Sequence, residues 1–60
     1  MKKYIIMWDY GYGEEYEEVE TESEDEAQEI AYQNWKEGAE GQANYAIIGE
    51  STEELRDGYL

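Results

Sequence analysis

The chain lacks most of the side chains that small domains use for crosslinking or catalysis. Its 60 residues contain no cysteine, no histidine and no phenylalanine, and only four lysine and arginine residues. Without cysteine and histidine, disulfide crosslinks and the usual zinc and copper ligands are excluded. Ser23 and Ser51 have no histidine to activate them as nucleophiles. We therefore expect no enzyme activity and no cofactor.

Carboxylates are what the chain has in excess. Seventeen acidic residues against four basic ones give a formal net charge of −13. This exceeds the charge of about 2–8 that suits a small soluble domain, and it opposes compaction by self-repulsion. Ten of the sixteen residues from Glu14 to Glu29 are acidic. That segment lacks the alternating ligands and central glycine of a calcium-binding loop, so we expect no dedicated metal site.

High net charge with few apolar residues is also typical of disorder. Seven tyrosines and two tryptophans, together with apolar residues at regular spacing, favour a folded chain. We expect one small acidic domain over residues 1–60. Because a chain this short buries only about 60% of its unfolded surface, stabilisation by a homodimer or by a binding partner is an open alternative.

Apolar periodicity predicts three strands and one helix. The strands are expected at residues 3–9, 14–21 and 42–49, and the two glycines of segment 10–13 predict a turn between the first two. Apolar side chains at helical spacing predict a helix over residues 24–37; they are Ala27, Ile30, Ala31 and Trp35. The sequence thus predicts an α+β fold, β-β-α-β, with a three-stranded antiparallel or mixed sheet in the order 2-1-3. One helix covers one sheet face, and we expect the other face to be open.

Capping signals define the helix ends. Ser23 and Glu26 have the spacing of a capping box, and the acidic first turn complements the helix dipole. Gly38 or Gly41 is expected to end this helix. Ser51 begins a second capping-box pattern, which predicts a short C-terminal helix with Ser51 as N-cap.

The N-terminal apolar segment is better interpreted as a strand than as a signal peptide. Its apolar run is five residues long, shorter than a signal-peptide core, and Asp9 ends it without a cleavage site. No transmembrane segment is visible, and an anionic membrane surface would repel the chain. We expect a cytoplasmic location.

The acidic second strand suggests a function. Alternate side chains on a strand lie about 6.6–6.8 Å apart. Two rows of carboxylates would result, one of Glu14, Glu18 and Glu20 and one of Glu15 and Glu17, continued by the first helical turn. Such rows can replace phosphates in a DNA-binding groove. The expected partner is a DNA-binding protein with a basic groove, without direct binding of nucleic acid. The alternative of another class is an acidic structural or regulatory module that binds a basic protein.

Aromatic residues extend this prediction. Tyr10 and Tyr12, on the glycine turn, are expected at the surface as anchors of the interface. Trp8 and Trp35 are expected mainly in the core, because a domain without phenylalanine must build its core from tyrosine and tryptophan.

The chain resembles phage-encoded inhibitors that mimic DNA and evade host defence. Within this group, the segment 46–52 is similar to the part of uracil-DNA glycosylase inhibitors where an apolar strand leads into a Glu-Ser pair. The resemblance implies that Glu50 and Ser51 enter the DNA cleft of the glycosylase. It also implies an apolar pocket between helix and sheet, formed by Met7, Ile30 and Trp35. Anti-CRISPR and anti-restriction inhibitors are the next alternatives, and the expected location is then the cytoplasm of an infected bacterium. Ser51 fits both the inhibitory pair and the helix cap.

Overall fold

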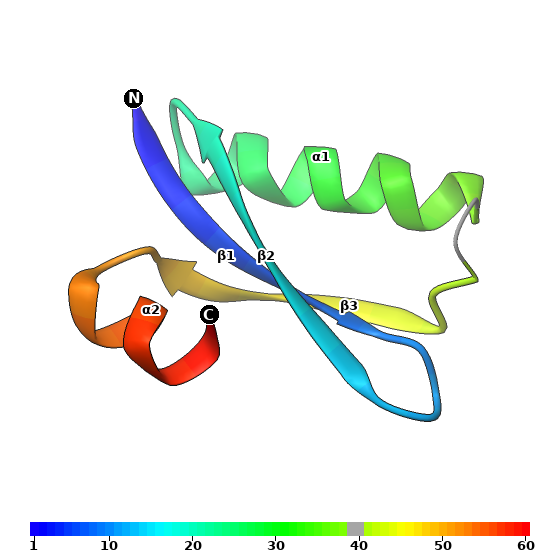
Figure 1. Ribbon diagram of the computed structural model, residues 1–60. Helices are drawn as coiled ribbons and strands as arrows, with labels where there is room; N and C mark the ends of the chain where they lie inside the picture. Colours follow the sequence, from blue (N-terminus) through cyan, green and yellow to red (C-terminus); the bar gives the residue numbers. More distant parts are fainter. Residues whose placement is uncertain (39–40) are drawn as a thin grey trace.

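The computed structural model describes residues 1–38 and 41–60. Its elements are β1 (Lys2–Asp9), β2 (Glu14–Thr21), α1 (Glu24–Glu37), β3 (Asn44–Glu50) and α2 (Glu53–Tyr59) (Figure 1). This order confirms the predicted α+β arrangement, including the short C-terminal helix.

The three strands form one sheet in the order β2-β1-β3. β1 is antiparallel to both neighbours, so β2 and β3 run in the same direction. Ile6 lies opposite Ile47 on β3, and a β-bulge separates it from the pairing of Ile5 with Gly49. β1 takes the central position because it is the most apolar strand, and its side chains are buried on both faces of the sheet.

One sheet face packs against α1 (Figure 1). The core on this side consists of Ile6, Trp8 and Ala31, with Val19 and Tyr45 among the half-buried residues around it. The alanines of α1 have small side chains, so the helix approaches the sheet closely at its buried stripe. This packing confirms the predicted covering helix.

The prediction of a core position for Trp35 was wrong. Its exposed fraction is 36%, in contrast to 4% for Trp8. The indole Nε1 of Trp35 donates a hydrogen bond of 3.2 Å to the carbonyl of Ala43. The side chain lies near the end of α1, where it packs against the connection to β3 rather than beneath the helix.

α2 lies on the opposite side of the sheet from α1 (Figure 1). Ile5, which points away from Ile6 by strand alternation, is fully buried. Leu55 of α2 reaches to 3.6 Å from the position that a Cβ of Gly49 would take, and Gly49 is the β3 neighbour of Ile5. The second sheet face is therefore covered here, and the expectation that it is open was wrong where α2 packs.

The caps of the two helices differ in how well the sequence predicted them. Ser23 is the N-cap of α1, and its Oγ accepts the Glu26 N–H at 3.3 Å. Gly38 ends α1 in the left-handed conformation, with φ of 63°. α2 begins after Thr52, whose Oγ1 accepts the Leu55 N–H at 3.2 Å. Ser51 is therefore not the N-cap that the sequence predicted, because its hydroxyl is used elsewhere.

Among the described residues, no helix is long and apolar enough to cross a membrane.

Candidate interaction surface

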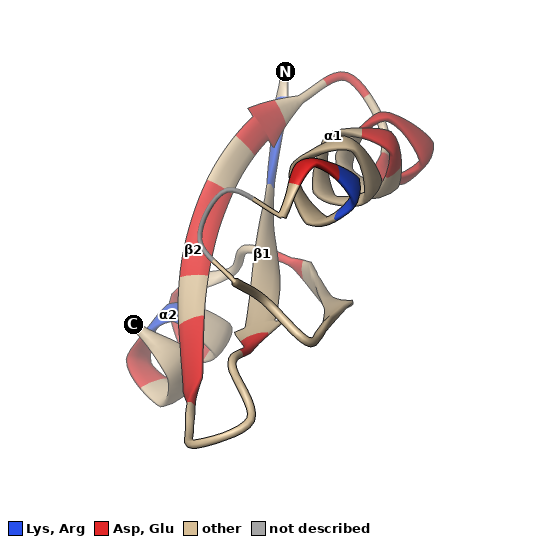
Figure 2. Cartoon of the chain, turned by 90° about the vertical axis from the view of Figure 1, so that its right-hand side faces the viewer, with Lys and Arg blue, Asp and Glu red and all other residues tan. Residues whose placement is uncertain are grey.

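Acidic residues follow β2 and continue into the start of α1 (Figure 2). We call this set the acidic ribbon; its members are Glu14, Glu15, Glu17, Glu20, Glu22, Glu24, Asp25, Glu26 and Glu29. All are exposed except Glu26, which is half-buried. Because β2 is an edge strand, no further strand stands between the ribbon and an approaching protein.

The sheet register assigns the carboxylates of β2 to its two faces. Glu15 lies opposite Trp8 and Glu17 opposite Ile6, so both are on the face that α1 covers. The carboxylates of Glu14, Glu18 and Glu20 are on the α2 face by strand alternation. The two rows anticipated from the sequence therefore correspond to the two faces of the edge strand.

Glu18 differs from the other acidic residues of β2 because it is half-buried and forms ion pairs with described residues. Its side chain is 24% exposed, and the hydroxyl of Ser51 donates a hydrogen bond to it. The Nζ of Lys3 and the Nε of Arg56 each lie 3.9 Å from a carboxylate oxygen of Glu18. These contacts link β2 to β1, to the end of β3 and to α2. Glu18 was predicted to bind a partner, but in this structure its carboxylate holds the α2 side of the fold together.

A second internal contact lies at the other end of β2. The hydroxyl of Tyr16 donates a hydrogen bond of 2.9 Å to Oε2 of Glu14. This hydrogen bond raises the pKa of Tyr16 above its usual value, and desolvation together with the nearby negative charge acts in the same direction. The ring of Tyr16 packs against Tyr59 of α2, with centroids 4.8 Å apart.

Glu50 and Ser51 have different environments. Glu50 is exposed and lies opposite Tyr4 at the end of β3, with β1 between it and β2. The structure therefore does not bring Glu50 into the acidic ribbon. Ser51 is half-buried, its N–H donates to the carbonyl of Lys3, and its hydroxyl donates to Glu18. In this conformation the Ser51 hydroxyl is occupied.

The tyrosines of the glycine turn have unequal exposure. Tyr12 is 90% exposed, whereas Tyr10 is half-buried and packs against the core of the α1 face. The two rings stack with centroids 5.9 Å apart. Tyr12 thus has the predicted surface position, and Tyr10 serves partly as core.

Sequence reasoning missed an aromatic row that runs from the core to the surface. Trp8 contacts Tyr45 at 6.1 Å, Tyr45 contacts Trp35 at 5.8 Å, and Trp35 contacts Tyr32 at 6.1 Å, all between ring centroids. The three-residue spacing of Tyr32 and Trp35 on the helix was the one signal in the sequence that could have revealed their contact with each other. Their contact with β3 depends on the connection between α1 and β3, which local periodicity does not describe.

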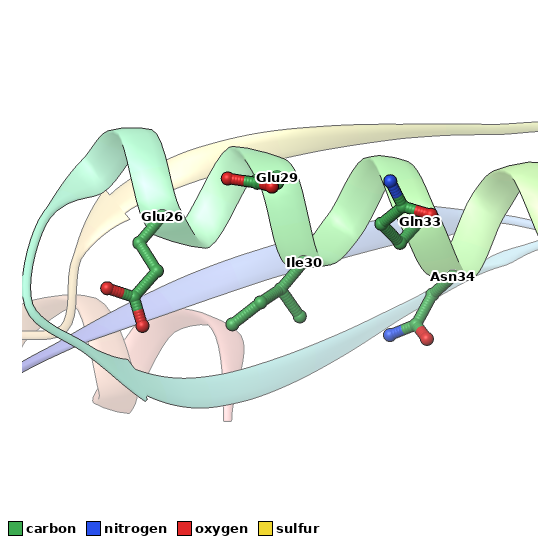
Figure 3. Close-up of a pocket in the computed structure, with 5 residues that line it drawn as sticks. All are labelled: Glu26, Glu29, Ile30, Gln33 and Asn34. Atoms are coloured by element: carbon green, nitrogen blue, oxygen red, sulfur yellow. The ribbon is translucent and has the colours of Figure 1, made fainter.

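A shallow cavity of about 270 Å³ lies along α1, lined by Glu26, Glu29, Ile30, Gln33 and Asn34 (Figure 3). Of the residues expected to form a pocket, only Ile30 lines this cavity. Met7 alternates with Ile6 and Trp8 on β1, so it points to the face away from α1. Trp35 packs against Tyr45 instead. The expected pocket of Met7, Ile30 and Trp35 is therefore wrong.

The described residues include no group of three or more acidic side chains placed to hold a metal ion. Comparison with protein-family models, with curated proteins and with solved structures finds no significant match to this chain.

Proposed function

We propose that the chain is an inhibitor that occupies the DNA-binding site of a nucleic-acid enzyme by presenting carboxylates in place of phosphates. The observation that carries this proposal is the acidic ribbon. Among the described residues, both ion pairs belong to Glu18, so the ribbon carboxylates have no cationic partner in that part of the chain. Their charge is available to an external basic surface.

Structural needs explain only part of this charge. Glu24, Asp25 and Glu26 lie in the first turn of α1, where negative charge complements the helix dipole. Carboxylates on an edge strand also prevent edge-to-edge aggregation. Glu15 and Glu17 add repulsion to a chain of net charge −13 without an ion pair to any described residue. A positive partner surface supplies a reason to retain them.

Uracil-DNA glycosylase is the target that we propose first. The support is the resemblance of segment 46–52 to the Glu-Ser segment of glycosylase inhibitors, and Glu50 is exposed as an entering residue must be. Inhibition by the ribbon alone would depend on Glu15 and Glu17, whereas inhibition by the Glu-Ser segment would depend on Glu50. The two routes are separable because Glu50 lies on the strand farthest from β2.

The test is uracil excision from a duplex by a bacterial uracil-DNA glycosylase, with increasing amounts of the protein. We expect excision to fall to background, and inhibition to weaken steeply with salt because phosphate-like contacts are electrostatic. The double variant E15Q/E17Q should bind the glycosylase about 1–2 kcal/mol more weakly, roughly five- to thirtyfold. This assumes that the contact of each glutamate with a basic residue of the enzyme contributes as much as a typical exposed ion pair or somewhat more.

The matched control is E53Q/E54Q, which removes two exposed carboxylates from the first turn of α2, outside the ribbon. It should inhibit like the unmodified protein. Full excision at saturating protein would eliminate the glycosylase as target. If a partner bound the protein and DNA simultaneously, the function would instead be that of an acidic module that binds a basic protein.

A further inference from the structure

The cavity on α1 combines an apolar base with carboxylates. Ile30 is half-buried beside the buried Ala31. Glu26, Ile30 and Asn34 form one row at four-residue spacing along the helix, and Glu29 and Gln33 form the next row. Figure 3 shows Ile30 between the side chains of Glu26 and Asn34, with those of Glu29 and Gln33 above it on the helix. Glu26 and Glu29 form no ion pair with any described residue.

The size and charge of the cavity limit what it can hold. Its volume of about 270 Å³ lies below the range of about 300–1,000 Å³ typical of small-molecule sites. A single side chain therefore fits better than a nucleotide or cofactor. An anion would be repelled by Glu26 and Glu29, and Glu17 of β2 lies on the same sheet face. The cavity is complementary to a cation that also has an apolar part.

Arginine matches this combination better than lysine. Its methylene groups can cover Ile30 while its head group remains at the polar edge. The planar guanidinium is weakly hydrated and binds a carboxylate through two parallel hydrogen bonds. The side-chain carbonyls of Gln33 and Asn34 offer further acceptors. Lysine has a comparable apolar stem, but its ammonium is a strongly hydrated point charge that cannot form the two parallel hydrogen bonds.

We propose that this α1 cavity binds an arginine side chain of a basic protein partner, with Ile30 against its stem and Glu26 and Glu29 around its guanidinium. One part of this proposal rests on the proposed function, namely that the arginine belongs to a DNA-binding protein. The site itself can be tested without DNA or any glycosylase.

The experiment titrates the full-length ¹⁵N-labelled protein with hexa-arginine and, separately, with hexa-lysine, following backbone amide shifts by NMR. We expect hexa-arginine to bind about fivefold or more tightly, with the largest shifts from Glu26 to Asn34. The double variant E26Q/E29Q should reduce hexa-arginine binding by about fivefold or more, and E53Q/E54Q should not. E26Q keeps the hydrogen bond from the backbone N–H of residue 26 to the Ser23 hydroxyl, because the Glu26 side chain takes no part in it, so α1 should persist.

The variant Ile30→Ala tests the apolar contact separately from charge. It should weaken hexa-arginine binding more than hexa-lysine binding, because the proposed site holds the arginine stem against Ile30. The proposal is overturned if the unmodified protein binds both peptides equally, or if E26Q/E29Q and E53Q/E54Q weaken hexa-arginine binding equally. These outcomes would indicate diffuse electrostatic attraction. Localised arginine binding together with unimpeded uracil excision would retain the site and reject the glycosylase as target.

Discussion

Glu18 should behave oppositely to its neighbours on β2 when its charge is removed. In E18Q, two ion pairs at 3.9 Å to half-exposed cations are lost, each contributing about 0.2–1 kcal/mol. The hydrogen bond from Ser51 loses its charge-assisted character, a further loss of about 1 kcal/mol. Relief of repulsion offsets a few tenths. We expect the free energy of unfolding to fall by about 1–2 kcal/mol.

The matched control is E17Q, one residue away and without an ion pair to any described residue. Its effect should lie within about 0.5 kcal/mol of zero, on the stabilising side, because it only reduces the net negative charge. Urea unfolding monitored by circular dichroism at low ionic strength measures both variants. In thermal melts, the E18Q midpoint should be lower by about 5–15 °C.

Salt provides an internal check on this prediction. Added sodium chloride should reduce the difference between E18Q and the unmodified protein, because the cations of both ion pairs are half-exposed and are screened. If E18Q were as stable as E17Q, the assignment of Glu18 as the residue that links β2 to α2 would be refuted.

Four further substitutions test other parts of the structure. Thr21→Val removes the 2.8 Å hydrogen bond from a buried hydroxyl to the carbonyl of the α1 N-cap and should cost about 1 kcal/mol in urea unfolding. Gly38→Ala puts a residue with a Cβ at a backbone φ of 63°, which should lower the free energy of unfolding by about 1 kcal/mol. Gly58→Ala, within α2 and in open space, should raise it by about 0.5–1 kcal/mol; opposite signs in thermal melts would contradict both glycine assignments. Because the raised pKa of Tyr16 stabilises the fold while the phenol is protonated, this contribution is present below about pH 10 and is lost as pH rises through the folded pKa. Glu14→Gln should lower that pKa in an NMR titration of the Tyr16 ring, and an unchanged pKa would show that the hydrogen bond to Glu14 is not its cause.

Local patterns predicted most of the fold. The alternation of Tyr4, Ile6 and Trp8 indicated a strand, and the apolarity of both its faces indicated that it is central. Ser23 was predicted correctly as the N-cap of α1, because a capping box is a local pattern that involves only residues three positions apart. The two-glycine turn then fixed the hairpin, and the sheet order followed from chain connectivity.

The missed features depend on contacts that are distant in sequence. Ser51 and Thr52 are adjacent residues that can each cap a helix, and local spacing does not separate them. Thr52 is the residue that caps α2. The Ser51 hydroxyl instead donates a hydrogen bond to Glu18, which lies 33 positions away in the chain. The same long-range packing places α2 on the sheet face of Ile5. The sequence of so short a helix does not indicate which face of the sheet the helix will cover.

The sequence predicted where the candidate interaction surface lies, but not which of its carboxylates are exposed. The acidic composition of β2 indicated an exposed edge, and the structure has that strand at the edge of the sheet. Composition did not distinguish Glu18 from Glu17, because burial and cationic neighbours arise only from the fold. The cavity around Ile30 is lined by residues of α1 alone, but the spacing of those residues indicates only that they share a face of the helix.

Competition with DNA tests the central proposal most directly. A fluorescently labelled protein bound to uracil-DNA glycosylase would be titrated with unlabelled duplex while its anisotropy is recorded. The proposal predicts complete displacement at saturating duplex, with a displacement midpoint that rises linearly with the concentration of free labelled protein. A labelled protein that remained bound while the same glycosylase held DNA would contradict the replacement of phosphates by the acidic ribbon.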